Sequence, residues 1–167
     1  MSNLEILDKL YMQEALKQAQ VAYKADEVPV GAVITFQNKI IAKSHNQVEL
    51  LKDPTAHAEM IAITQASNSL ESKWLLDCTL YVTLEPCSMC AGALVLSRIK
   101  RVVYGAKDLK TGACGSVVNL ARHTKLNHQF ELSEGFLADE CGGLLSDFFK
   151  SKRESAKIRL DKNRLMN

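Results

Sequence analysis

The N-terminal segment of the chain carries apolar residues at a helical period. They recur every three or four positions, at Met12, Ala15, Leu16, Ala19 and Tyr23. This pattern is typical of an amphipathic α-helix that packs one face against a core. The stretch 26–29, which closes with Pro29, predicts the end of this helix because proline cannot continue it.

The rest of the chain alternates between strand-like and helix-like segments. Residues 30–36 are rich in β-branched side chains, and with a turn at 37–38 and an apolar run over 39–42 they predict a β-hairpin. Further on, the pattern predicts a polar loop over 44–54, strands over 80–84, 101–105 and 130–132, and helices over 56–68 (with Thr55 as N-cap), 87–96 and 137–156. Strands that alternate with helices indicate an α/β layered fold with helices on both faces of the sheet.

Length and composition favour one globular domain over residues 1–167. Hydrophobic residues make up 47% of the chain and charged residues 24%, which excludes a disordered protein. No apolar run approaches the roughly 18–20 residues of a membrane span, and the acid-rich N-terminus is not a signal peptide. Five cysteines without a signal peptide predict reduced thiols and a cytoplasmic location.

The net charge of +2 is unevenly distributed. Residues 98–125 carry +6 and residues 150–167 carry +5, whereas residues 126–149 carry −5. Two basic blocks favour a polyanionic partner on part of the surface, and a solubilising surface with a polar C-terminal helix explains them equally well.

Two short motifs carry the candidate chemistry: His57-Ala58-Glu59 at a predicted helix start, and Pro86-Cys87-Ser88-Met89-Cys90 where a strand meets a helix. Two cysteines three positions apart in a first helical turn share one face, so both sulfurs can bind one metal ion. The helix N-terminus favours the thiolate form that binds metals. A histidine from a second helix completes a Cys/Cys/His set, which suits Zn²⁺.

Three protein ligands leave an open coordination position, which is typical of a catalytic zinc that activates a water. Glu59 lies in the same helical turn as His57, so its carboxylate can take a proton from that water and pass it to a leaving group. This arrangement suits hydrolytic attack on an amidine-like carbon with release of ammonia.

A redox Cys-x-x-Cys pair and a structural zinc site are the alternatives. A structural site needs a fourth ligand, and no second ligand pair with zinc-finger spacing occurs in the chain. Cys78, Cys114 and Cys141 are expected to be small buried residues. The combination of His-x-Glu with Pro-Cys-x-x-Cys is the signature of zinc deaminases, which favours catalysis over both alternatives.

Beyond these motifs, the chain resembles the cytidine deaminase-like superfamily, and within it the bacterial tRNA-specific adenosine deaminases. The resemblance covers about residues 5–152 and is carried by the segments 27–33, 53–59, 79–87, 110–112 and 144–149. It implies a three-layer α/β/α fold on a five-stranded mixed sheet, and a homodimer. It also implies hydrolysis of the wobble adenosine of a tRNA anticodon to inosine, with one Zn²⁺ per subunit held by His57, Cys87 and Cys90, and proton transfer by Glu59.

The resemblance further implies which residues bind substrate. Val30 and Asn46 lie where family members hold the flipped base, the backbone N–H of Ala58 is placed to meet the base as well, and Asp108 lies where they hold the ribose. Phe148 and Phe149 match aromatic residues that contact neighbouring anticodon nucleotides. The basic block 98–125 and the basic tail 150–167 are then expected to meet phosphates of the anticodon stem.

Each of these residues also has a plain structural explanation. Val30 fits the core of a strand, Asn46 fits a turn, and Asp108 can simply neutralise Lys107 and Lys110. The two phenylalanines are adjacent, so on a helix only one can face the core fully and the other is free to stack on a base. The sequence does not distinguish which one does so.

Two other functions fit the same motifs. A deaminase of a free base or nucleoside, such as guanine, cytosine or cytidine, uses the same zinc chemistry, because the motif specifies the reaction and not the substrate. A zinc-dependent RNA-binding subunit without turnover is the second, and Glu59 argues against it because a pure binding module needs no proton shuttle.

Overall fold

The computed structural model describes residues 2–165, with side chains placed over residues 2–160. Its elements in chain order are α1 (Asn3–Lys24), β1 (Gly31–Phe36), β2 (Lys39–His45), α2 (Val48–Leu51), α3 (Ala58–Ser69), β3 (Cys78–Leu84), α4 (Ser88–Leu96), β4 (Arg101–Ala106), β5 (Glu131–Glu134) and α5 (Ala138–Leu165). After α1 and the β1–β2 hairpin, helices and strands follow one another along the chain as the hydrophobic pattern predicts, with β4 followed directly by β5.

The strands form a five-stranded mixed sheet in the order β2-β1-β3-β4-β5. Strand β1 runs antiparallel to β2 and β3, whereas β3, β4 and β5 run parallel to one another. The predicted five-stranded mixed sheet is confirmed. In the parallel half, β3 and β4 have their carboxyl ends at the same edge, which is where open α/β sheets bind ligands.

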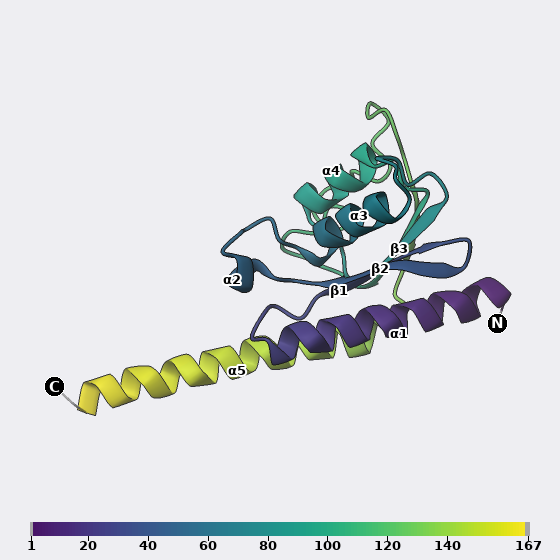
Figure 1. The fold of residues 1–167 in the computed structure, drawn as a ribbon. Coiled ribbons are helices and arrows are strands. Elements are labelled where there is room, and N and C mark those ends of the chain that lie inside the picture. Colours follow the sequence, from purple (N-terminus) through teal and green to yellow (C-terminus); the bar gives the residue numbers. More distant parts are fainter. Residues whose placement is uncertain (1, 166–167) are drawn as a thin grey trace.

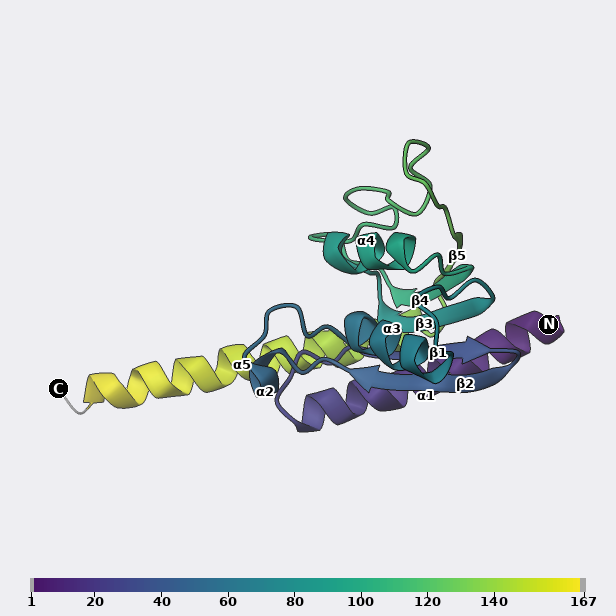
Figure 2. The same cartoon turned by 45° about the horizontal axis from the view of Figure 1, so that its top comes forward.

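Helices cover both faces of the sheet. In Figures 1 and 2, α1 and α5 lie side by side on one face, and α3 and α4 lie on the other. A large apolar cluster fills the α3/α4 side and a smaller one fills the α1/α5 side. The close packing of α1 requires Gly31, because a Cβ atom there would lie 2.1 Å from the carbonyl oxygen of Ala15. The three-layer α/β/α architecture is therefore confirmed.

Three differences from the sequence prediction affect the site or the tail, and the other element boundaries shift by one or two residues. The helix expected over 56–68 begins at Ala58 with His57 as its N-cap, because Thr55 instead donates through its N–H and hydroxyl to the Asp53 carboxylate. The predicted polar loop 44–54 contains the end of β2 and the short helix α2. The final helix continues past the predicted end at 156 to Leu165, the last residue that the structure describes.

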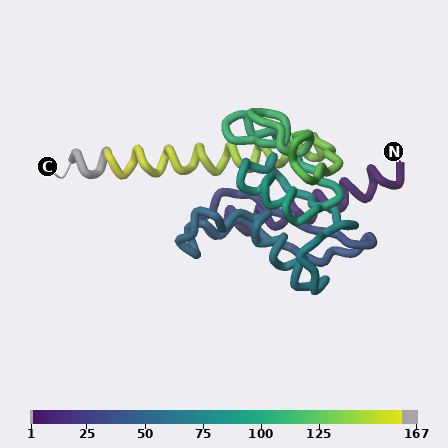
Figure 3. Tube along the Cα trace, turned by 90° about the horizontal axis from the view of Figure 1, so that it is seen from above, coloured from purple at the N-terminus to yellow at the C-terminus, as the bar shows by residue number. Residues whose placement is uncertain are grey.

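The second half of α5 projects beyond the sheet and the other helices (Figures 1 and 3). Every side chain from Phe149 to Leu160 is exposed. The predicted basic tail 150–167 corresponds to this projection, except that residues 166–167 lie outside the described residues. Within the described part of the chain, no helix is long and apolar enough to span a membrane.

Candidate active site

The N-termini of α3 and α4 meet at one point and bring three metal-binding side chains together. His57 caps α3, Cys87 caps α4, and Cys90 lies in the first turn of α4. His57 Nδ1 lies 3.7 Å from Cys87 Sγ and 3.6 Å from Cys90 Sγ. Tetrahedral Zn²⁺ with ordinary Zn–S and Zn–N bond lengths requires an N···S separation of about 3.6 Å. The soft donor set and its spacing therefore fit zinc.

The two cysteines have different protonation tendencies. A hydrogen bond from Cys90 lowers the pKa of Cys87 to about 4, and a second one from His57 acts in the same direction. The bond to Cys87, together with burial, raises the pKa of Cys90. The bond to Cys87 also raises the pKa of His57. The three groups thus share protons, which a bound metal ion would displace.

Glu59 lies in the first turn of α3 and is buried, with 4% of its surface exposed. Burial raises the pKa of this carboxyl to about 7. Cys90 acts on the pKa of Glu59 in the opposite direction, and Glu59 in turn contributes to the raised pKa of Cys90. A carboxyl group in this position has the reach required of a proton carrier beside the metal-binding group.

A cavity of about 910 Å³ opens beside the metal-binding group. Several parts of the chain line it: the segment 25–30, the segment 45–50 with Pro54, the motif around His57, the motif around Cys87, the loop after β4, and the root of the α5 projection. His57, Glu59 and Cys87 form part of its wall. Its volume is in the range of sites that bind a small molecule or an extruded base.

The cavity brings together most of the residues expected to bind substrate. Val30 and Asn46 line it and are nearly fully buried, and Asp108 lines it from the loop after β4. Asn46 Oδ1 accepts a hydrogen bond from the backbone N–H of Ala58 at 2.9 Å. The Ala58 N–H, expected to meet the base directly, is therefore already engaged by Asn46 in this structure.

Asp108 shapes its own loop. Its carboxylate accepts hydrogen bonds from the backbone N–H groups of Lys110 and Thr111 and from the Thr111 hydroxyl. Burial tends to raise the pKa of Asp108, but these hydrogen bonds lower it on balance. No salt bridge joins Asp108 to Lys107 or Lys110 among the described residues, and Lys107 pairs with Glu134 instead. The Asp108 carboxylate therefore interacts mainly with the backbone and the threonine hydroxyl of its own loop.

The two adjacent phenylalanines have different environments. Phe148 is 6% exposed and packs edge-on against Tyr23 of α1, with ring centroids 5.6 Å apart. Phe149 is 45% exposed. Both line the cavity. The packing distinguishes what the sequence could not: Phe148 anchors α5 to α1, and Phe149 is the ring left free for stacking.

Glu27, His45 and Glu85 also line the cavity, although the sequence predicted no role for them. Glu27 is buried, and its carboxylate accepts hydrogen bonds from the backbone N–H groups of Glu49 and Leu50 at the start of α2. The local sequence could not predict these bonds, because the donors lie more than twenty residues away. Glu85 falls within the segment 79–87 that carries the family resemblance, but nothing in the sequence predicted its hydrogen bonds.

The remaining cysteines take no part in the metal-binding group. Cys78, Cys114 and Cys141 are buried free thiols, as expected. Among the described residues, His57, Cys87 and Cys90 form the single group of three or more side chains with metal-ligand spacing. No fourth protein ligand joins them there, so the arrangement has the open position of a catalytic site.

The fold and this site define a deaminase, and comparison with known proteins agrees. A family model described as MafB19-like deaminase matches residues 7–153. The tRNA-specific adenosine deaminase of Bacillus subtilis (strain 168) is 49% identical over 150 residues, which cover 90% of this chain and 93% of that protein. The corresponding protein of Aquifex aeolicus (strain VF5) is 50% identical over 145 residues, or 87% of this chain and 95% of that one. The chain belongs to the tRNA-specific adenosine deaminase family.

Solved structures support the same assignment. A structure from a study of A-to-I editing by tRNA:A34 deaminases is 40% identical, has a TM-score of 0.79, and covers 81% of this chain and 99% of its own. A guanine deaminase from Bacillus subtilis is 38% identical with a TM-score of 0.57, and it covers 64% of this chain and 66% of its own. The expected cytidine deaminase-like fold is confirmed.

Proposed function

We propose that this protein hydrolyses adenosine at the wobble position of a tRNA anticodon to inosine and releases ammonia. The observation that carries the proposal is the buried Glu59 beside the His57/Cys87/Cys90 group, on the wall of a cavity that is also lined by Phe149. The near full-length similarity to tRNA-specific adenosine deaminases supports the substrate.

His57, Cys87 and Cys90 would hold one Zn²⁺ per subunit. The ion would lower the pKa of a water molecule, which would serve as the nucleophile. Glu59, which lines the cavity beside these ligands, would take one proton from the attacking water and deliver it to the amino group at C6 of adenine. A carbon–oxygen bond forms at C6, the carbon–nitrogen bond breaks, and ammonia leaves with the transferred proton.

Asn46 and Val30 hold the base in this proposal. The bond from Ala58 fixes Asn46 Oδ1, which leaves the amide nitrogen of Asn46 as the donor toward the substrate. Val30 offers an apolar contact to the base, and Ala58 acts through Asn46. A hydroxyl of the ribose can donate to Asp108, whose carboxylate is already oriented by Lys110 and Thr111.

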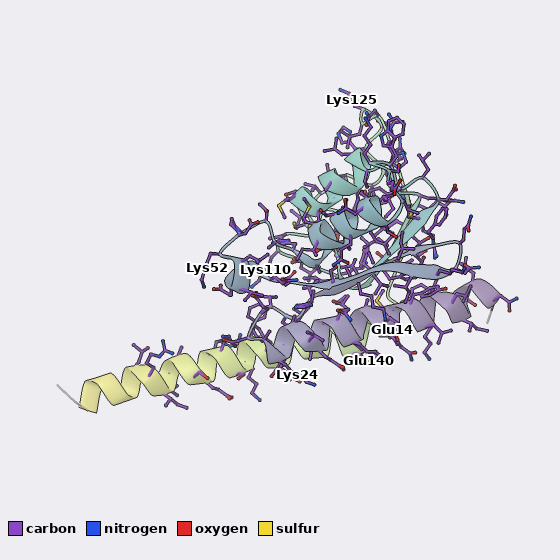
Figure 4. The ribbon with its side chains drawn as sticks, viewed as in Figure 1. Glu14, Lys24, Lys52, Lys110, Lys125 and Glu140 are labelled. Carbon is purple, nitrogen blue, oxygen red and sulfur yellow. The ribbon has the colours of Figure 1, made fainter. Side chains whose placement is uncertain are left out.

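An anticodon loop suits this cavity because its bases are unstacked, so little energy is needed to turn one into a pocket. Phe149 offers a ring for a neighbouring base. Lys52 and Lys110 lie at the end of the molecule that carries α2 (Figure 4), and the basic projection of α5 begins at the cavity. These cations can meet the phosphates of the stem.

We also propose that residues 1–167 form a single deaminase domain, and that the protein works as a homodimer in the cytoplasm. The similarity to bacterial tRNA-modifying enzymes supports the cytoplasmic location, and the family resemblance supports the dimer. Sedimentation equilibrium of the zinc-loaded protein measures the oligomeric state directly.

The proposal is tested by an inosine assay on an anticodon stem-loop with adenosine at the wobble position, run beside free adenosine, cytidine, cytosine and guanine. Inosine in the stem-loop with all small substrates unchanged supports the proposal. Conversion of guanine or another small substrate with the stem-loop intact would keep the chemistry and overturn the substrate.

A further inference from the structure

Glu85 occupies an unusual place between the sheet and the metal-binding group. It follows the last residue of β3 and precedes the Pro86–Cys87 segment. Its side chain is 1% exposed and lines the cavity. Within the described part of the chain no lysine, arginine or histidine forms a salt bridge with it. A buried carboxylate without a cationic partner requires several hydrogen bonds.

All the hydrogen bonds to this carboxylate come from one loop, residues 108–116. Oε2 accepts from the backbone N–H of Asp108 at 3.0 Å and from the Ser116 hydroxyl. Oε1 accepts from the backbone N–H groups of Cys114 at 3.1 Å and Ser116 at 3.0 Å. Both oxygens therefore accept two bonds each, and Glu85 fixes both ends of the loop.

The same loop packs directly on the metal-binding segment. The backbone N–H of Ala113 donates to the carbonyl of Pro86 at 2.8 Å, and Cys87 forms an antiparallel β-bridge with Gly112. There is no room for a side chain at Gly112, since a Cβ atom there would lie 2.5 Å from the Glu85 carboxylate and from the carbonyl oxygen of Asp108. The loop is thus held between Glu85 and Cys87.

We propose that Glu85 is a positioning residue for the deamination reaction. Its carboxylate holds the 108–116 loop and thereby fixes the position of Asp108, on the substrate side, relative to Cys87, on the metal side. Glu85 itself touches neither the substrate nor the metal in this proposal. The inference rests on the proposed function for its choice of substrate, and on the hydrogen bonds of the loop for its mechanism.

Glu85→Gln separates positioning from general support of the fold. An amide can keep Oε1 as an acceptor for Cys114 and Ser116, but its NH₂ group then faces the N–H of Asp108 and cannot accept from it. The hydroxyl of Ser116 can rotate to accept instead. The variant is thus expected to free the Asp108 end of the loop while the Cys114 end stays in place.

The test compares wild type, Glu85→Gln and the charge-matched control Glu71→Gln, whose side chain is exposed. For Glu85→Gln we expect zinc content close to wild type and a thermal midpoint lower by a few degrees, because the Asp108 N–H loses its acceptor. We also expect a fall in kcat/KM of about tenfold or more that arises mainly from KM, and faster hydrogen–deuterium exchange at the Asp108 amide. Glu71→Gln is expected to match wild type in all four. An unchanged KM together with unchanged exchange at Asp108 would overturn the proposal, as would a loss of activity that merely follows a loss of zinc or of folded protein.

Gly112→Ala provides a second route if Glu85→Gln does not fold. The added methyl group would push the loop away from Glu85, so we expect the same rise in KM and the same faster exchange at Asp108. Wild-type kcat/KM in a folded Gly112→Ala protein would overturn the proposal. The exchange measurement needs no substrate, so it still decides the role of Glu85 if the stem-loop proves not to be the substrate.

Discussion

Asn46 and Ala58 are joined by a buried hydrogen bond in which Asn46 Oδ1 accepts from the backbone N–H of Ala58 at 2.9 Å. This bond connects the end of β2 to the start of α3, directly between the metal-binding His57 and the buried Glu59. It satisfies one of the helix N–H groups that have no partner inside the helix. It also fixes which way the Asn46 amide faces, so one side chain contributes to both folding and binding.

Asn46→Ala is therefore expected to impair both stability and activity. The unsatisfied Ala58 N–H should lower the free energy of unfolding by about 1–3 kcal/mol, and loss of the amide donor should reduce kcat/KM on the stem-loop. Ser44→Ala is the matched control, because Ser44 donates to the Ala58 carbonyl at 2.6 Å but does not line the cavity. Denaturant unfolding should show a loss for both variants, and only Asn46→Ala should lose most of its activity. Equal activity in the two would argue against contact between Asn46 and substrate.

Glu59→Gln should remove catalysis and leave binding intact. The amide has the same shape but cannot carry the proton, so ammonia release should fall by about 10²–10⁴-fold. Zinc content and stem-loop affinity should stay near wild type. These are measured by a coupled ammonia assay, metal analysis and fluorescence anisotropy. Product formation at the wild-type rate would show that Glu59 is not the proton carrier.

Cys90→Ser should lose the metal. Replacing one soft ligand in a three-ligand set weakens zinc binding, and metal analysis should show a content well below one zinc per subunit. The thermal midpoint should fall as well, because a metal that binds the folded state stabilises it. Cys114→Ala is the control, since Cys114 is equally buried and lies outside the metal-binding group. Full zinc content in Cys90→Ser would remove Cys90 from the proposed ligands.

Replacement of Phe148 and of Phe149 by alanine should affect different properties of the protein. Phe148→Ala removes a ring buried against Tyr23 and should lower the free energy of unfolding by about 3–5 kcal/mol. Phe149→Ala should leave stability nearly unchanged but weaken stem-loop binding by about 1–3 kcal/mol, because the ring no longer stacks on a base. Thermal unfolding and anisotropy titrations measure the two effects. Unchanged RNA affinity in Phe149→Ala would exclude stacking on this ring.

Truncation after Phe149 should weaken RNA binding and leave zinc content unchanged. It removes the basic tail that starts at Lys150, so the dependence of log K on log salt should become less steep by about 0.7–0.9 for each phosphate that the tail neutralises. Glu154→Gln, which makes the tail more basic, should tighten binding slightly. A truncated protein with the same affinity and salt slope would place the tail outside the interface.

The sequence by itself determined the features that depend on local spacing. The Cys87/Cys90 pair needed only one helical turn to share a face, and His57 and Glu59 needed only the start of a helix. The two helical layers followed from the alternation of strands and helices, because βα units pack in few ways. The resemblance to known deaminases added the five-stranded mixed sheet and the expected substrate residues.

Tertiary structure alone decided the features that depend on partners distant in the chain. Helix α2 forms within a predicted loop because Glu27 accepts hydrogen bonds from its first turn, more than twenty residues away in the chain. The different environments of Phe148 and Phe149 follow from the position of α1 against α5. The role of Glu85 depends on donors between 23 and 31 residues further on. No local pattern encodes such contacts, because each exists only once the chain has folded two separate segments against each other.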